Sequence, residues 1–157
     1  MVKQLSIEKT FAWLLVVIWM GFIFYLSHQT AEESSELSSS VTATIRELIQ
    51  FINLNIDVPI EILHHYIRKS AHFVVYLILG VLVFNALFVS QMNQVRHALI
   101  AIMICVIYAT IDEFHQLFIP GRSGEITDVL IDSIGATIGT IFYKSMSRFI
   151  IFKRSKI

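Results

Sequence analysis

The sequence HALIAIMICVIYATIDEFHQLF, residues 97–118, is an apolar run that ends in the acidic and amide side chains of DEFHQ at 112–116. A run of ~20 apolar residues is long enough to cross the hydrocarbon core of a bilayer as a helix. An ionisable side chain inside that core costs roughly 2.5–3.5 kcal/mol on insertion scales, so such groups usually face a bundle interior or a wet cavity and serve function. The stretch therefore predicts a membrane-spanning helix that carries part of a functional site at its end.

Three further apolar stretches of similar length accompany it. Of the 157 residues, 55% are hydrophobic and 15% are charged, whereas a typical soluble domain is about 45–50% apolar and about 25% charged. Spanning segments must satisfy their backbone polar groups internally, and the alternation of barrel strands is absent, so helices are expected. We predict an all-α membrane protein, a four-transmembrane-helix bundle, that forms one domain over residues 1–157 and crosses the membrane at about 11–26, 72–89, 97–118 and 126–146.

The positive charges indicate how the bundle is oriented. With the N-terminus inside, eight of the 12 Lys and Arg residues fall in inner segments and four in outer ones. This distribution favours two cytoplasmic termini. The first apolar run is longer than a usual signal-peptide core, so we expect it to remain as an anchor. We therefore expect a multi-pass protein of the cell membrane, with the lipid bilayer as its partner. The net charge of +0 gives no indication of nucleic acid binding, and the sequence identifies no protein partner.

The long connection between the first two spans, residues 27–71, has a helical pattern of its own. Residues 34–40, SSELSSS, are polar and typical of a turn. The segment after them repeats apolar residues at helical spacing, which predicts an amphipathic extracytoplasmic helix on the outer membrane surface or over the bundle. Its apolar residues are Val41, Ile45, Leu48, Ile49 and Ile52. The stretch NLNIDVP at 53–59 would end this helix, because proline disfavours helix in the preceding residue, and a second helix from about Ile60 would lead into the second span.

Three side chains at the start of the second span share one helical face. Lys69, His72 and Tyr76 are spaced at i, i+3 and i+7, and they offer a cation, a titratable imidazole and a phenol. Alternatively, Lys69 snorkels to the interface and Tyr76 belongs to an aromatic belt. His72 has no evident packing purpose at this boundary, so we interpret it as a proton-handling group. His64 and His65 are expected at the lipid–water boundary as outer candidates.

The acidic end of the third span offers carboxylates for acid–base chemistry. On a helix, Glu113 and Gln116 share a face, and Asp112 flanks it. A carboxylate in a low-dielectric setting either finds a cation or takes up a proton, so Glu113 is a candidate general acid or base. Arg122, in the short connection to the fourth span, could capture a phosphate or carboxylate of a ligand in a bidentate way. It could equally neutralise Asp112 or Asp128 within the fold.

The fourth span places two carboxylates on a helix that is suited to close packing. Asp128 and Asp132 are one turn apart, and Gly135 and Gly139 form a pair of small residues that permits close contact between membrane helices. Asp132 shares a face with the two glycines, because all three positions repeat at helical spacing. We therefore expect Asp132 to lie in the bundle interior.

The sequence gives little support for a resident metal or a reactive thiol. A divalent cation would need several oxygen-rich side chains close together. The candidates for such a site are His72, Asp112, Glu113, Asp128 and Asp132. No His or Cys spacing matches a zinc motif, so no cofactor or metal is assigned, although a divalent cation stays open. The single cysteine, Cys105, lies within an apolar run and is expected to be buried and unreactive.

Three blocks of sequence, taken together and in order, resemble the VanZ-like family. They are RKSAHFVVY at 68–76, DEFHQLFIPGR at 112–122, and the pattern of Asp128, Asp132, Gly135 and Gly139. The resemblance covers nearly the whole chain, from the region of Ser27 to Gly139. It implies a small multi-pass membrane fold and a link to low-level teicoplanin resistance in Gram-positive bacteria, and it names no reaction. Many members have Asn where this chain has Asp132.

We expect a polar pocket that opens to the outer face and binds or alters a surface-exposed cell-envelope component, which would reduce glycopeptide access. An anionic lipid or a lipid-linked cell-wall component would suit its cations. One alternative is a membrane-embedded hydrolase or transferase that acts on a lipid-linked envelope substrate, and another is a structural scaffold for partner membrane proteins. The candidate catalytic residues are Glu113, His72 and Asp112. The candidate ligand-binding residues are Lys69, Tyr76, Gln116, Arg122, Asp128 and Asp132.

Overall fold

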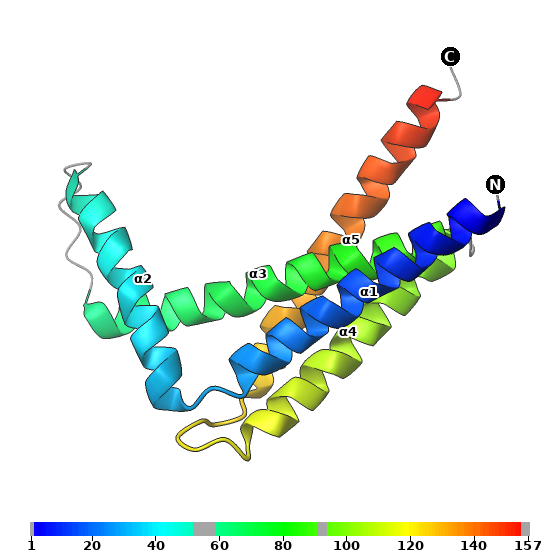
Figure 1. Cartoon of the computed structure of the whole chain (residues 1–157). Helices are drawn as coiled ribbons and strands as arrows, with labels where there is room; N and C mark the ends of the chain where they lie inside the picture. Colours follow the sequence, from blue (N-terminus) through cyan, green and yellow to red (C-terminus); the bar gives the residue numbers. More distant parts are fainter. Residues whose placement is uncertain (1, 52–58, 91–93, 155–157) are drawn as a thin grey trace.

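The computed structural model is all-helical over the residues it describes, which are 2–51, 59–90 and 94–154. Figure 1 shows the helices in chain order, coloured from blue to red. They are α1 (Val2–Ser27), α2 (Ala31–Phe51), α3 (Ile60–Val89), α4 (Gln94–Gln116) and α5 (Ile126–Arg154). This arrangement confirms the predicted fold class.

Four of these helices are long and apolar enough to cross a membrane, as predicted. The candidate spans are Ser6–Ser27, Ile62–Val89, Arg96–Gln116 and Ile126–Ser147. Large apolar side chains remain exposed along all four helices, among them Leu14 of α1 and Ile107 of α4, as expected of a surface that faces lipid. The four-span bundle is therefore confirmed, with boundaries that differ most in the second span.

The second span begins at Ile62 rather than near His72. The helix that we predicted from about Ile60, leading into the second span, is confirmed, because α3 runs unbroken over 30 residues from Ile60 into this span. A helix of that length measures about 45 Å at a rise of 1.5 Å per residue, whereas the hydrocarbon core is about 30 Å thick. The polar first turns of α3 can therefore extend beyond the core.

The four spanning helices form one bundle, and α2 stands away from it at an angle (Figure 1). The start of α1 and the end of α5 lie at the same end of the bundle. The connections from α1 to α2 and from α4 to α5 lie at the opposite end, together with the start of α3. The side of the membrane on which each end lies stays a prediction from the charge distribution.

The interface between α3 and α5 is the most extensive in the bundle, and glycines allow it. A Cβ atom added to Gly139 would lie 2.0 Å from the backbone oxygen of Leu77, and one added to Gly135 would lie 2.4 Å from that of Phe73. From the other side, a Cβ on Gly80 would lie 2.2 Å from the oxygen of Ala136. The two backbones therefore approach as closely as the predicted glycine pair permits.

Polar contacts tie α1 to the other helices. Trp19 Nε1 donates a hydrogen bond to the carbonyl of Val75 at 2.9 Å, and the Tyr108 hydroxyl donates one to the carbonyl of Met20 at 2.6 Å. Near the ends of α1 and α4, His28 Nδ1 and His115 Nε2 lie 3.2 Å apart. Because lipid offers no competing partner for polar groups, such contacts help to fix how membrane helices pack.

Helix α2 begins earlier than the sequence suggested. The Thr30 hydroxyl accepts a hydrogen bond from the backbone N–H of Glu33 at 3.3 Å, and the Glu33 carboxylate accepts one from the backbone N–H of Thr30 at 2.9 Å. This reciprocal pair is a capping box. Residues 34–40, predicted as a turn, are therefore helical, and their serines donate to their own helix, as Ser38 Oγ does to the Ser34 carbonyl at 2.8 Å.

The predicted amphipathic segment lies within α2, which contacts α3. Val41 is 45% exposed and Ile45 is partly buried, so the apolar face of this helix is only partly covered by the bundle. The side chains of Leu48 and Ile49, the whole of Ile52 and the predicted break at 53–58 lie outside the described residues.

The close approach of α3 and α5 predicts that Gly139→Ala lowers the stability of the bundle. The added methyl group would meet the backbone of Leu77, which can yield only if the helices separate. We expect a loss of about 1–3 kcal/mol, typical of overpacking, measured by thermal unfolding of the detergent-solubilised chain. Gly21→Ala is the matched control, because a Cβ at Gly21 would have no neighbour within 4 Å. Equal stability of the two variants would contradict the close packing.

Candidate ligand-binding site

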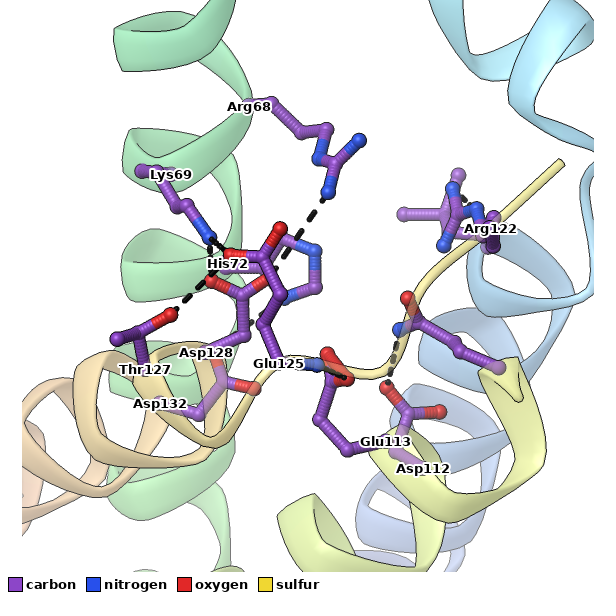
Figure 2. A network of polar contacts seen from close by, with 12 residues as sticks. Arg68, Lys69, His72, Asp112, Glu113, Arg122, Glu125, Thr127, Asp128 and Asp132 are labelled. Carbon is purple, nitrogen blue, oxygen red and sulfur yellow. Dashed lines mark hydrogen bonds and ion pairs between the residues drawn. The ribbon is translucent and has the colours of Figure 1, made fainter.

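Four carboxylates predicted from the sequence come together near one end of the bundle and are almost completely buried. The relative exposures of Asp112, Glu113, Asp128 and Asp132 are 3%, 5%, 0% and 0%. Figure 2 shows that they come from α4 and α5 and that α3 supplies basic residues opposite them. A buried charge is costly unless it is paired or hydrogen-bonded, so the partners of each carboxylate decide what it can do.

Lys69 links α3 to the beginning of α5. Its ammonium group donates to Asp128 Oδ1 and, at 2.8 Å, to Glu125 Oε2 (Figure 2). The Lys69 side chain is only 12% exposed, and a second cation, Arg68, lies with Nη2 4.0 Å from Asp128 Oδ2. The charge of Lys69 is therefore directed into the protein, where it compensates a buried carboxylate.

His72 lies one turn further along α3 and faces Asp132 of α5. The distance from His72 Nδ1 to Asp132 Oδ1 is 3.4 Å, and both side chains are largely buried. With Nδ1 on this side, the second ring nitrogen points away from Asp132. The imidazole thus lies within ion-pair distance of a buried carboxylate, and histidine is the side chain used most often as a general acid or base.

Glu113 and Asp112 are held in different ways at the end of α4. Glu113 Oε2 accepts a hydrogen bond from the backbone N–H of Glu125 at 2.9 Å, which fastens the connection to α5 onto α4. Asp112 Oδ2 accepts one from Gln116 Nε2 at 3.5 Å. The other oxygens, Asp112 Oδ1 and Glu113 Oε1, are buried without a hydrogen-bond partner among the described residues. The acid–base roles of these two residues stay proposals.

A cavity of about 140 Å³ lies beside these carboxylates, between α1, α2, α3 and the end of α4. Five of the predicted site residues line it, namely His72, Tyr76, Asp112, Gln116 and Arg122. Its apolar walls come from α1, α2 and α3 and consist of Ile23, Leu26, Leu37, Val41, Ile67 and Val75. The remaining predicted site residues lie outside the set that lines this cavity, and they are Lys69, Glu113, Asp128 and Asp132.

Arg68 lines the cavity although the sequence reasoning did not select it. The sequence spacing could have indicated Arg68 as a site residue, because Arg68 is one turn before His72 and shares the same helical face. The face of Arg68, His72 and Val75 meets the cavity, whereas Lys69, one residue further along, meets Asp128 instead.

Arg122, which comes from the connection between α4 and α5, lines the cavity. Figure 2 shows its side chain beside this connection. Its Nη2 donates to the backbone carbonyl of Leu26 at 3.5 Å, and its Nε is buried without a hydrogen-bond partner in the described part of the chain. Burial, followed by the repulsion of Arg68, lowers the pKa of Arg122, but a guanidinium stays protonated in proteins. Among the described residues Arg122 forms no ion pair with Asp112, Asp128 or another carboxylate.

The oxygen-rich residues are not gathered as a metal site. Within residues 2–51, 59–90 and 94–154, no group of three or more His, Cys, Asp and Glu side chains is arranged to hold a metal ion. The carboxylates instead face Lys69, His72 and a backbone N–H. The divalent cation that the sequence left open stays a prediction. Cys105 is buried, as expected.

The pairing of Lys69 with Asp128 predicts that Lys69→Met destabilises the bundle. Removing one partner of a buried ion pair leaves the other uncompensated, which costs about 3–5 kcal/mol. Combining Lys69→Met with Asp128→Asn should recover most of the loss, because no buried charge is then stranded. Unfolding of detergent-solubilised variants measures this, with Lys9→Met on α1 as control. A double variant no more stable than the single one would contradict the pairing.

The hydrogen bond from Lys69 lowers the pKa of Glu125 below its ordinary value. Because the folded-state pKa is the lower one, Glu125 contributes stability above about pH 4.5 that is lost as the pH falls through its folded-state pKa. Lys69→Met should raise the pKa of Glu125 towards its ordinary value, which carboxyl-carbon NMR titration measures, with Glu125→Gln identifying the signal. An unchanged titration in Lys69→Met would contradict the contact.

Comparison with known proteins identifies the family of the chain and nothing closer. A family model described as VanZ/LLP1 matches residues 11–151, which is nearly the whole chain. No curated protein matches the chain, and no solved structure does.

Proposed function

Because this chain belongs to the VanZ/LLP1 family, we propose that it binds a surface-exposed, anionic lipid or lipid-linked component of the cell envelope. The bound part would occupy the cavity between α1, α2, α3 and α4. Family membership and four apolar helices indicate a multi-pass membrane protein, in which such a ligand is available from the surrounding bilayer. Holding it would reduce the access of glycopeptides such as teicoplanin, in line with the resemblance to VanZ-like proteins.

The observation that supports this proposal is the surroundings of the Arg122 guanidinium. Its guanidinium lines the cavity, is bonded only to a carbonyl among the described residues, and has no carboxylate partner there. Arg68 lines the same cavity, 4.0 Å from Asp128 and with its side chain 36% exposed. Two guanidinium groups that line one cavity favour an anion there, and their planar forks match phosphate or carboxylate geometry.

The apolar walls of the cavity suit the remainder of an amphiphile. Leu37 and Val41 of α2 line the cavity and are 56% and 45% exposed, so this wall is only partly covered by protein. A ligand site usually combines apolar lining with a few placed polar groups. An acyl or prenyl chain along these walls would therefore place an attached phosphate at Arg122. The charge distribution of the chain favours the outer face for this end of the bundle.

A second candidate function is supported by the contact between His72 and Asp132. His72 lines the cavity, and its Nδ1 lies 3.4 Å from the buried carboxylate of Asp132. This arrangement favours a hydrolase or transferase in which His72 moves a proton, with Asp112 beside it and Glu113 nearby. If the chain were instead a scaffold for partner membrane proteins, the polar network would act only in folding.

The binding proposal predicts that Arg122→Gln loses an anionic lipid that co-purifies with the wild-type chain. A hydrogen bond to a charged group is worth about 1.5–3 kcal/mol, so retention should fall about tenfold to a hundredfold. Mass spectrometry of lipids extracted from equal amounts of purified chain measures this. Arg96→Gln is the matched control, because Arg96 is exposed near the start of α4, at the other end of the bundle.

The same experiment separates the three functions. Equal retention of every anionic lipid by wild type and Arg122→Gln would overturn the binding proposal. A lipid species that is formed in cells with the wild-type chain and is absent with His72→Asn would favour the enzyme. Loss of folding in both variants, with no lipid retained by the wild type, would favour the scaffold.

A further inference from the structure

A second, polar cavity adjoins the first. It measures about 290 Å³ and lies between the start of α2, the start of α3 and the connection from α4 to α5. Ser34, Ser38 and Arg68 line both cavities, so the two meet at these residues. An amphiphile with its phosphate at Arg68 and Arg122 would therefore have polar space beyond the phosphate, on the side away from its apolar chain.

Most of the residues that line this polar cavity carry hydrogen-bonding side chains. The residues beyond the three shared ones are Ala31, Ser35, His64, His65, Ser123 and Glu125. His64 Nε2 is buried without a hydrogen-bond partner among the described residues. Hydroxyl and neutral imidazole groups can both donate and accept hydrogen bonds. A wall of this kind matches ligand hydroxyl groups, which also donate and accept.

The charges in the polar cavity disfavour a cationic head group. Among the described residues that line it, the one acid is Glu125, which already accepts hydrogen bonds from Lys69 at 2.8 Å and from Thr127 at 3.2 Å. Its other charged residue, Arg68, is positive and would repel an ammonium group. A choline or ethanolamine head group would thus meet a cation and no free carboxylate among the described lining residues.

We infer that the ligand is a phospholipid-like molecule whose phosphate carries a neutral polyhydroxyl head group, such as a sugar or an inositol. This inference rests on the proposed function, because it uses the same phosphate position at Arg68 and Arg122. The apolar chain follows Leu26, Leu37 and Val41, and the hydroxyl groups of the head contact Ser35 and His64.

Native mass spectrometry of the full chain with two defined lipids tests this. Phosphatidylinositol and phosphatidylethanol with identical acyl chains carry the same phosphodiester charge, and only the first has head-group hydroxyls. We expect about tenfold stronger retention of phosphatidylinositol, as two or three neutral hydrogen bonds would give. In Ser35→Val combined with His64→Leu this preference should disappear, while phosphatidylethanol is retained as in wild type.

The outcomes separate this inference from the binding proposal. Equal retention of the two lipids by the wild type would overturn the polyhydroxyl head group and leave the anion site intact. Retention of neither lipid, with no loss in Arg122→Gln, would overturn both. His64→Gln, which keeps hydrogen-bonding capacity, should preserve the preference. A preference that persists in Ser35→Val combined with His64→Leu would show that the head group does not contact these two residues.

A competition experiment identifies which class of lipid supplies such a head group. Displacement of phosphatidylinositol by a polyprenyl phosphate that carries a hexose, and not by bare polyprenyl phosphate, would assign the ligand to the polyprenyl carriers. Failure of both to compete would assign it to the glycerolipids. Equal displacement by both would contradict a role for the hydroxyl groups.

Discussion

Burying four carboxylates at one end of a membrane helix bundle is the constraint on which the rest of the structure depends. Asp112, Glu113, Asp128 and Asp132 are nearly inaccessible, in a region where an unpaired charge is strongly unfavourable. Lys69 compensates the charge of Asp128, and His72 faces Asp132. Both contacts run from α3 to α5, the two helices whose backbones the glycines allow to approach most closely. Packing and charge compensation therefore require the same helix alignment.

This constraint separates the charges that hold the fold from those that can meet a ligand. Lys69 is engaged by two carboxylates, and Glu113 fastens the connection between α4 and α5. Arg122 is the contrasting case, because it faces a cavity with apolar walls and has no carboxylate partner among the described residues. The site thus combines four buried carboxylates with a guanidinium that has no carboxylate partner among the described residues. That combination suits an anionic amphiphile better than a soluble ligand.

Much of the fold could be predicted because its signals are local in the sequence. Apolar length located the four spans, and the spacing of Gly135 and Gly139 located the tight interface. The capping box of Thr30 and Glu33 was equally local, but the serines after it resembled a turn. The pairing of charges could not be predicted, since it depends on how each helix is rotated against the others. Neighbouring positions on a helix differ by about 100°, so Lys69 donates to Asp128 and Glu125, whereas Arg68 lines the cavity and lies with Nη2 4.0 Å from Asp128.

The most direct test of the central claim is an experimental structure of the full chain in lipid nanodiscs, with its co-purified lipids retained. We expect density for an anionic group between Arg68 and Arg122, with an apolar chain along Leu37 and Val41. We also expect Lys69 to stay directed at Asp128. A cavity closed by α2, with Arg122 paired to Asp112 or Asp128, would contradict the central claim, because the guanidinium would then belong to the fold and not to a ligand site.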